Sequence, residues 1–477
     1  MDAFMRESDA FSWYMERDPA LRSTVVAIVW LDRSPDWEAF AARAEWATGQ
    51  VPSFRQRVVE PPGRLAPPRW TEDEEFDLSW HVRRMEAPAP HDARAVVDFA
   101  RGEAMTAFDP ARPLWQFTLV EHVDGHRAAL VMKLHHSLTD GLGGMQLAML
   151  LFDREQDRAG HVPEEDGHQH IDVRHLSTPE LIVDSLAHDG RRLADRLGGL
   201  AAAALPAALY AARHPRASVG GALSALASVG RTVAPMRETL SPVMRQRGLS
   251  RHLDQVEVQL ADLKRAARAA NGSVNDGFMA AVTGGLQRYH ERHDKQIGRL
   301  RVTLPISIRT PTDPLGGNRI TLIRFPVPVA EPDPAARVRQ MRQACLAARA
   351  ERSLAYTDGI AGTLNLLPSG FIGSMLKHVD FLASDVPGLP FPVYLAGVRV
   401  RRYVAFGPTI GSAVNLTLLS YADTCAIGLN IDSSAVPDPD VLVECIRDGF
   451  DEVLGLAGSF QPARLPLHEA KGAAWSA

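Results

Sequence analysis

Two adjacent histidines, followed by an aspartate and a glycine, have the types and spacing best suited to catalysis in this chain. They lie in a segment that reads His-His-Ser-Leu-Thr-Asp-Gly over residues 135–141. A neutral histidine, with a pKa near about 6.5, can take the proton of an alcohol as the alcohol attacks an activated acyl group. A thioester is already activated, so transfer needs no covalent enzyme intermediate. The segment therefore indicates a histidine general base, and acyl transfer to an alcohol is one reaction that such a base can serve.

The elements around this segment decide which side chains can face a substrate. An apolar strand pattern ends just before His135, and a helical pattern begins just after Gly141. Neighbouring residues of a strand point to opposite sides, so only one of His135 and His136 can readily face the substrate. Asp140 can fold back to brace the loop. Gly141 removes a side chain where a long cofactor arm must pass.

Other functions of the segment are less well supported. His136 and Asp140 could hold a metal ion, but no third ligand lies nearby and adjacent histidines rarely share an ion, so we expect no metal. The glycines around 141–144 resemble part of a dinucleotide-binding fingerprint, but Gln146 occupies its third glycine position. The sequence contains neither a Gly-x-Ser-x-Gly elbow nor a phosphate-binding loop, which argues against serine hydrolases and nucleotide hydrolases.

Length and composition limit the class of protein. The chain has 477 residues, 45% of them hydrophobic and 23% charged, and a formal net charge of −5. This length predicts two domains, and the absence of a basic excess predicts no nucleic-acid partner. Three widely spaced cysteines fit reduced thiols in the cytoplasm. We expect neither a secretion signal nor a membrane-spanning helix.

Alternating strand and helix patterns occupy two stretches of the chain. The first, residues 1–155, predicts strands at 24–31, 115–121 and 127–134 and helices near 37–44 and 93–108. The second, residues 251–461, predicts strands at 256–260, 301–308, 320–327, 394–404, 414–420 and 425–430, and helices at 261–270, from Ser273, at 333–352 and at 438–454. Residues 156–250 predict a polar loop and a basic helical linker, and residues 462–477 a loose tail. The expected class is α/β, with two lobes joined by a helical linker.

The segment at 135–141 resembles the HHxxxDG motif of the coenzyme A dependent acyltransferase superfamily, which includes chloramphenicol acetyltransferase and the condensation domains of peptide synthetases. Three further stretches resemble one branch, the bacterial wax ester synthase/acyl-CoA:diacylglycerol acyltransferases: Pro113-Leu114-Trp115, Asn275-Asp276 and Ser384-Asp385-Val386-Pro387-Gly388. In the last stretch the family usually has asparagine where this chain has Asp385. The resemblance covers both lobes.

The resemblance implies two chloramphenicol-acetyltransferase-like lobes with the active site in a tunnel at their interface. It implies that His136 is the general base and that acyl-CoA is a co-substrate rather than a permanently bound cofactor. The acceptor would be diacylglycerol or a long-chain alcohol, which gives triacylglycerol or wax esters. His135, Asp140 and Gly141 would support the loop. Arg55 is the expected partner of Asp140, because it resembles the arginine of the corresponding condensation-domain segment.

Seven further residues are expected around the substrates: Pro113, Leu114, Trp115, Asn275, Asp276, Ser384 and Asn415. Structural roles remain open for most of them. The first three fit a strand start with core residues, and the next two fit the first turn of a helix, where an acid is favourable. Ser384 and Asn415 are candidate donors to the tetrahedral oxyanion.

Two questions about the activity stay open. The acceptor could instead be a polyketide-derived diol or an amine, and a protein that kept the fold but lost turnover would bind acyl-CoA or lipid without product. The stretch 190–250 has nine arginines against Asp195 and Glu238, which fits either a solvated helical face or a surface for anionic lipid. Lipid substrates favour a peripheral location on the inner face of the membrane or on lipid droplets.

Overall fold

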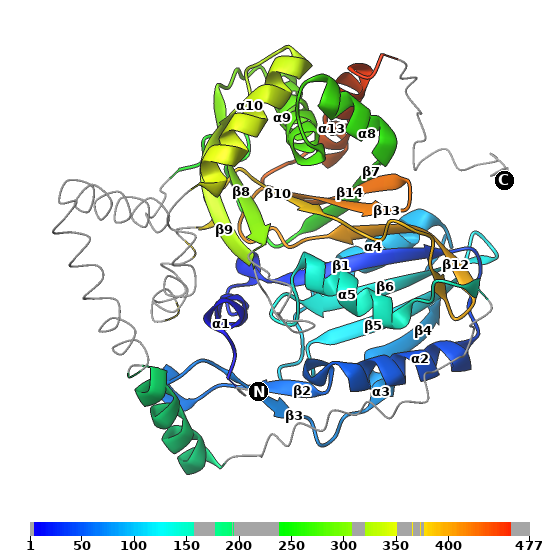
Figure 1. Cartoon of the computed structure of the whole chain (residues 1–477), viewed down its shortest axis with the longest axis vertical. Coiled ribbons are helices and arrows are strands. Elements are labelled where there is room, and N and C mark those ends of the chain that lie inside the picture. Colours follow the sequence, from blue (N-terminus) through cyan, green and yellow to red (C-terminus); the bar gives the residue numbers. More distant parts are fainter. Residues whose placement is uncertain are drawn as a thin grey trace, which may run out of the picture.

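Two lobes, each built around a six-stranded sheet, make up the part of the chain that a computed structural model describes (Figure 1). The described residues are 4–156, 177–192, 194, 238–307, 320–350, 365, 373 and 376–458. The predicted α/β class and two-lobe architecture are confirmed. None of the described helices is both long enough and apolar enough to cross a membrane.

The N-terminal sheet has the strand order β11-β12-β1-β6-β5-β4. Its strands are β1 (Thr24–Leu31), β4 (Val82–Glu86), β5 (Trp115–Val123), β6 (Arg127–His135), β11 (Tyr394–Leu395) and β12 (Val398–Phe406), and its helices are α2 (Trp37–Gln50), α4 (Ala93–Met105) and α5 (Gly141–Leu151). Val26 and Ile28 of β1 pack in one hydrophobic cluster with α4, whereas Ala27 and Val29 pack in another with α2 and α5. Burial on both faces explains the unbroken apolar run that predicted β1.

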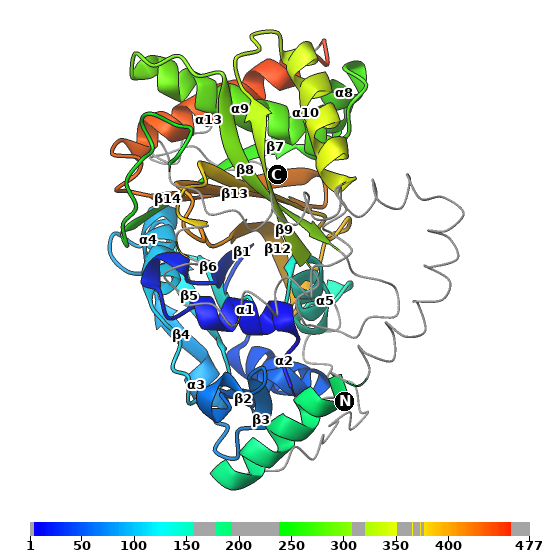
Figure 2. The same ribbon diagram turned by 90° about the vertical axis from the view of Figure 1, so that its left-hand side faces the viewer.

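The C-terminal sheet has the strand order β7-β14-β13-β10-β8-β9. Its strands are β7 (Arg251–Gln259), β8 (Arg299–Ser307), β9 (Ile320–Pro328), β10 (Phe381–Val386), β13 (Val414–Tyr421) and β14 (Thr424–Asp432). Four helices, α8 (Leu260–Ala269), α9 (Val274–Arg292), α10 (Pro334–Arg349) and α13 (Pro439–Gly455), cover the face that points away from the N-terminal lobe (Figure 2). Ser273 caps α9, as predicted.

One segment crosses from the second lobe into the first. Strand β12 pairs antiparallel with β1, so that Val26 lies opposite Phe406. The crossing strand also packs tightly on β14, because a β-carbon at Gly428 would lie 2.1 Å from the carbonyl oxygen of Ala405. The predicted assignment of all of 251–461 to the C-terminal lobe is therefore wrong for β11 and β12. The sequence also predicted one strand at 394–404, where the structure has two, β11 and β12.

The segment at 135–141 connects β6 to α5. Strands β5 and β6 form the predicted hairpin, and β6 ends at His135. Helix α5 begins at Gly141, with Asp140 as its N-cap residue. The candidate catalytic loop therefore follows a central strand directly, as the sequence predicts.

Several elements were not predicted, namely α1 (Glu7–Met15), α3 (Leu78–His81), β2 (Gln56–Val59), β3 (Arg69–Glu72), β4 and β10. Strands β2 and β3 form a separate two-stranded sheet. Helix α1 and strand β10 both matter for the candidate site, because both line the cavity between the lobes.

The predicted linker is described only in part. Residues 178–192 are helical, and this helix lies against the start of the chain: the rings of Phe4 and His188 are 4.1 Å apart, and Arg192 Nη1 is 2.5 Å from Glu7 Oε1. The predicted polar loop lies almost entirely outside the described residues. Most of the arginine-rich stretch and the predicted tail at 462–477 also lie outside them.

Candidate functional site

A cavity of about 230 Å³ lies between the two lobes. The N-terminal lobe contributes α1, β1 and the loop that carries His136, whereas the C-terminal lobe contributes β9, β10 and β13. Strand β12, which crosses between the lobes, supplies Tyr403 and Ala405. Most of the lining is apolar, which suits an aliphatic chain.

His136 is the histidine of the pair that faces this cavity. Its side chain is half-buried and lines the cavity, and its main-chain N–H donates to the carbonyl of Ser23 at 2.9 Å. Its Nδ1 is buried and has no hydrogen-bond partner among the described residues. Burial lowers the pKa of His136 and His135 lowers it further, whereas its own backbone and the Asp140 carboxylate oppose the shift. The ring is therefore neutral at pH 7, the state that a general base needs.

His135 points away from the cavity and is fully buried. Its Nδ1 accepts the main-chain N–H of Ser137 at 3.1 Å, so the ring proton lies on Nε2. That Nε2 is 3.3 Å from Oε2 of Glu16. The expected orienting role of His135 fits this placement, because both of its ring nitrogens contact protein groups.

Glu16 is a residue of the site that sequence reasoning missed. It follows α1, and its Oε2 also accepts the main-chain N–H of Ser23 at 2.9 Å. Burial alone would raise the pKa of Glu16, but the contact with His135, with smaller contributions from Ser23 and Arg22, lowers it overall. The carboxylate thus ties β1 and the catalytic loop together. No local pattern could have identified it, because His135 is distant from it in the sequence.

Asp140 braces the loop as expected, but not with the predicted partner. Its Oδ1 accepts the main-chain N–H of Gly143 at 2.7 Å and so caps α5. Arg55 instead pairs with Glu45 through Nη2, and its Nε donates to Thr48 Oγ1 at 3.2 Å. The predicted pair of Arg55 and Asp140 is therefore wrong. The arginine secures the end of α2 rather than the catalytic loop.

Gly141 lies where the two lobes approach each other. A β-carbon at this position would lie 2.8 Å from Cγ2 of Val386, at the end of β10. That distance is too short for a carbon contact without movement. The glycine lines the cavity, as predicted, but the atoms that require its missing side chain belong to the facing lobe.

The Pro113-Leu114-Trp115 motif is part of the core and does not line the cavity. Leu114 and Trp115 are fully buried, and the indole stacks on Phe54 with ring centroids 5.0 Å apart. The carbonyl of Leu114 accepts the main-chain N–H of His135 at 3.0 Å. The motif therefore holds the end of β6 in place, and the expected substrate contact is wrong.

The Asn275-Asp276 motif also lies away from the cavity. Oδ2 of Asp276 accepts the main-chain N–H and the hydroxyl of Ser273 at 2.8 Å each, which completes a capping box at the start of α9. Asn275 Nδ2 lies 3.7 Å from the thiol sulfur of Cys345. Of the two functions considered for this pair, capping fits the structure, and a substrate contact stays a prediction.

Ser384 and Asn415 do line the cavity, from β10 and β13 of the C-terminal lobe. Asn415 is committed to internal contacts, since Nδ2 donates to the carbonyl of Pro408 at 2.7 Å and Oδ1 accepts from Thr417 Oγ1 at 2.9 Å. No side-chain hydrogen bond of Ser384 occurs within the described part of the chain. Ser384 is therefore the freer of the two donors.

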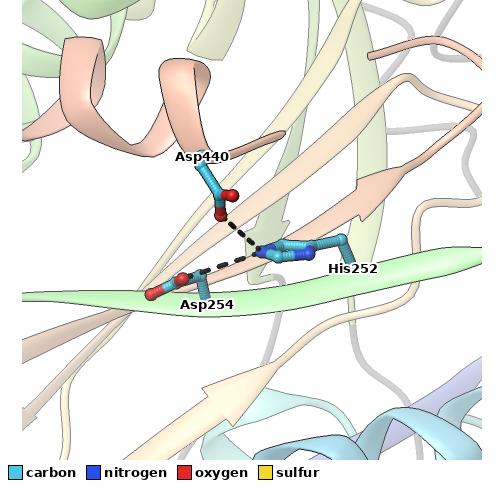
Figure 3. A group of neighbouring side chains, drawn as sticks. All are labelled: His252, Asp254 and Asp440. Carbon is cyan, nitrogen blue, oxygen red and sulfur yellow. Dashed lines mark ion pairs between the residues drawn. The ribbon is translucent and has the colours of Figure 1, made fainter. Parts of the chain in front are cut away.

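One group in the described part of the chain has metal-type ligands, outside the cavity (Figure 3). His252 Nε2 lies between Oδ2 of Asp254 at 3.7 Å and Oδ1 of Asp440 at 3.8 Å. Arg94 Nη1 is 3.7 Å from the same oxygen of Asp254, and the Asp440 side chain is 82% exposed. We assign no metal role to this group, because a guanidinium already occupies one side of it.

The chain matches two family models that together span both lobes. Residues 5–278 match the wax ester synthase/diacylglycerol acyltransferase catalytic domain, and residues 316–453 match the C-terminal domain of the same family. A putative diacylglycerol O-acyltransferase of Mycobacterium tuberculosis is 34% identical over 455 residues, which cover 94% of this chain and 91% of the relative. A second putative diacylglycerol O-acyltransferase of that organism is 27% identical over 473 residues, which cover 94% of this chain and 96% of the relative.

Solved structures share the fold. The wax ester synthase/diacylglycerol acyltransferase from Marinobacter aquaeolei VT8 aligns with a TM-score of 0.64 at 20% identity, covering 96% of this chain and all of that one. The starter condensation domain of rhizomide synthetase, in complex with C8-CoA, aligns with a TM-score of 0.58 at 13% identity, covering 98% of this chain and 97% of that one.

Proposed function

The chain belongs to the wax ester synthase/diacylglycerol acyltransferase family and is an acyltransferase, and from this premise we propose that it transfers acyl groups from acyl-CoA to diacylglycerol or long-chain alcohols. The products would be triacylglycerol or wax esters. The observation that carries the proposal is the placement of a neutral His136 in a largely apolar cavity between the lobes.

In the proposed reaction, the acceptor hydroxyl and the thioester meet in the cavity, and His136 takes the hydroxyl proton as the oxygen attacks the carbonyl carbon. The tetrahedral oxyanion then collapses, the carbon–sulfur bond breaks, and the coenzyme A thiolate recovers the proton from His136. Acyl-CoA thus acts as a co-substrate, and the C8-CoA bound to the rhizomide synthetase domain supports a channel for such a thioester.

The oxyanion needs a hydrogen-bond donor from the protein. Ser384 is the better candidate, because it lines the cavity from the lobe opposite His136 and makes no side-chain hydrogen bond to the described residues. Asn415 already donates to a carbonyl. We therefore assign the oxyanion to Ser384. A Ser384→Ala variant should lose turnover with every acceptor.

An acceptor panel tests the proposed substrates. Coenzyme A release from palmitoyl-CoA would be measured with hexadecanol, dioleoylglycerol, a short diol, an aliphatic amine and no acceptor. Release stimulated by the first two supports the proposal, and their ratio distinguishes wax ester from triacylglycerol synthesis. Stimulation by the diol or the amine alone would show that the acceptor is a diol or an amine and not a lipid. Tight palmitoyl-CoA binding without release would indicate a protein that has lost turnover.

We also propose a cytoplasmic location with peripheral contact to the inner face of the membrane or to lipid droplets. Val183 and Leu186 lie one turn apart on the helix at 178–192, and their side chains are 67% and 57% exposed. An exposed apolar stripe of this kind suits a lipid surface. Flotation with anionic vesicles should decrease in a V183D/L186D variant. Equal flotation would contradict the contact.

A further inference from the structure

The hydroxyl of Ser23 is a buried polar group that lines the cavity together with the candidate base and has no partner in the described part of the chain. The residue is 1% exposed, it lines the cavity, and its Oγ has no hydrogen-bond partner among the described residues. An unpaired buried hydroxyl costs about 1–3 kcal/mol of stability, so such groups are uncommon unless they bind something.

The pairing of β1 with β6 places the side chains of Ser23 and His136 on the same face. Thr24 lies opposite His135 in the antiparallel register, and one step further along the two strands brings Ser23 opposite His136. The carbonyl of Ser23 accepts the main-chain N–H of His136 at 2.9 Å, which confirms the step. Directly opposed residues share a face, with β-carbons about 4.5–5.5 Å apart. Both side chains accordingly line the same cavity.

The backbone around Ser23 is fixed by groups that the site already uses. Its N–H donates to Oε2 of Glu16 at 2.9 Å, and Glu16 also contacts His135. Ser23 therefore holds a constant position relative to the loop. Its Oγ is left without a partner among the described residues, and it can therefore donate a hydrogen bond to an acceptor oxygen that is bound to His136.

We infer that Ser23 is a further catalytic residue that orients the acceptor alcohol, an inference that rests on the proposed role of His136. The acceptor oxygen donates its proton to His136 and accepts a hydrogen bond from Ser23 Oγ–H on one lone pair. Its second lone pair then points at the thioester carbonyl. This role differs from that of Ser384, which lies on the opposite lobe and faces the carbonyl oxygen.

The two serines make different predictions for two kinds of acceptor. Oxyanion stabilisation serves an alcohol and a thiol acceptor alike, whereas the Ser23 hydrogen bond requires an acceptor oxygen, because a thiol sulfur accepts hydrogen bonds only weakly. Ser23→Ala should therefore lower kcat/KM for hexadecanol about 5- to 30-fold and lower kcat/KM for hexadecanethiol much less. The matched control Ser384→Ala should lower both by the same factor.

Thermal unfolding provides a second measurement. Because Ser23 Oγ has no partner among the described residues, Ser23→Ala should leave Tm unchanged or raise it. A lower Tm would show that the hydroxyl is paired within the protein and would overturn the inference. Wild-type alcoholysis in Ser23→Ala, or an equal loss with hexadecanol and hexadecanethiol, would also overturn it. If His136→Ala retained full turnover, the proposed function would fail instead, so the two failures are distinguishable.

Discussion

Oε2 of Glu16 lies 3.3 Å from Nε2 of His135, so a carboxylate after the first helix braces the histidine that precedes the candidate base. A Glu16→Gln variant keeps an oxygen for the N–H of Ser23 but removes the charge facing His135. We expect kcat to fall about 10-fold with little change in the KM for acyl-CoA, because small displacements of a catalytic group are costly. Steady-state kinetics with hexadecanol would measure this, and an unchanged kcat would contradict the brace.

The same residue should make stability depend on pH. The pKa of Glu16 is lowered from its ordinary value of 4.5, since the contacts from His135 and Ser23 outweigh burial. A carboxyl with a lowered folded-state pKa stabilises the protein above its unfolded pKa, and that stability is lost as the pH falls through the folded value. On acidification below pH 4.5, the wild type should therefore lose more unfolding free energy than Glu16→Gln. Parallel losses in urea titrations would argue against it.

Asp140 should affect the pH dependence of turnover through its charge. The pKa of His136 is lowered from 6.5, chiefly by burial, and the Asp140 carboxylate partly opposes this shift. The wild-type kcat/KM should stay level above pH 6.5 and decline only at lower pH, as His136 becomes protonated. Asp140→Asn retains an acceptor for Gly143 and should move the decline to still lower pH.

The cap can be separated from the charge with a second variant. Asp140→Ala removes the cap of α5 as well as the charge. It should therefore shift the pH dependence as Asp140→Asn does and, in addition, destabilise the protein by about 1 kcal/mol. A decline that moves to higher pH in Asp140→Asn would contradict the electrostatic role.

Residue 141 should have to be glycine because Val386 leaves no room for a β-carbon, and not because the coenzyme A arm passes there. Gly141→Ala forces a β-carbon to within 2.8 Å of a valine methyl and should destabilise the protein by about 1–3 kcal/mol while reducing turnover. Val386→Ala removes that methyl, so the double variant should recover both losses. A double-mutant cycle of unfolding free energies and rates measures the coupling. If the double variant were as impaired as Gly141→Ala, the glycine would instead provide clearance for substrate.

Trp115 should contribute to stability and not to substrate affinity. It is fully buried, and Nε1 donates to the carbonyl of Phe54 at 2.8 Å. Trp115→Ala should cost about 3–5 kcal/mol of unfolding free energy. Trp115→Phe should cost about 1 kcal/mol for the lost hydrogen bond. A raised KM for hexadecanol in Trp115→Phe, with unchanged stability, would restore a substrate role for this motif.

Local patterns predicted the elements that carry a local signal: an unbroken apolar run, a hairpin turn or a helix cap. β1, the hairpin of β5 and β6, and the capped helix α9 all form where expected. The loop residues His136 and Gly141 consequently line the cavity. β10 was not predicted, because Ser384 and Asp385 interrupt its apolar pattern where the strand enters the site.

Long-range relationships could not be predicted from these patterns. The pairing of β12 with β1 in the other lobe depends on the crossover, which leaves no signal in the strand itself. The contact of Glu16 with His135 likewise forms only in the folded chain. Arg55 pairs with Glu45 on the preceding helix, and nothing in the sequence favours that partner over Asp140. Charged side chains have many potential partners, and tertiary structure selects among them.

We propose that His136 is the base for acyl transfer between the lobes. The most direct test is the rate of alcohol-dependent coenzyme A release from palmitoyl-CoA by the wild type and His136→Ala, with Tm measured for both. If His136 is the base, the variant should lose about 10²- to 10⁴-fold of this rate at an unchanged Tm. Undiminished alcohol-dependent release by the folded variant would contradict it.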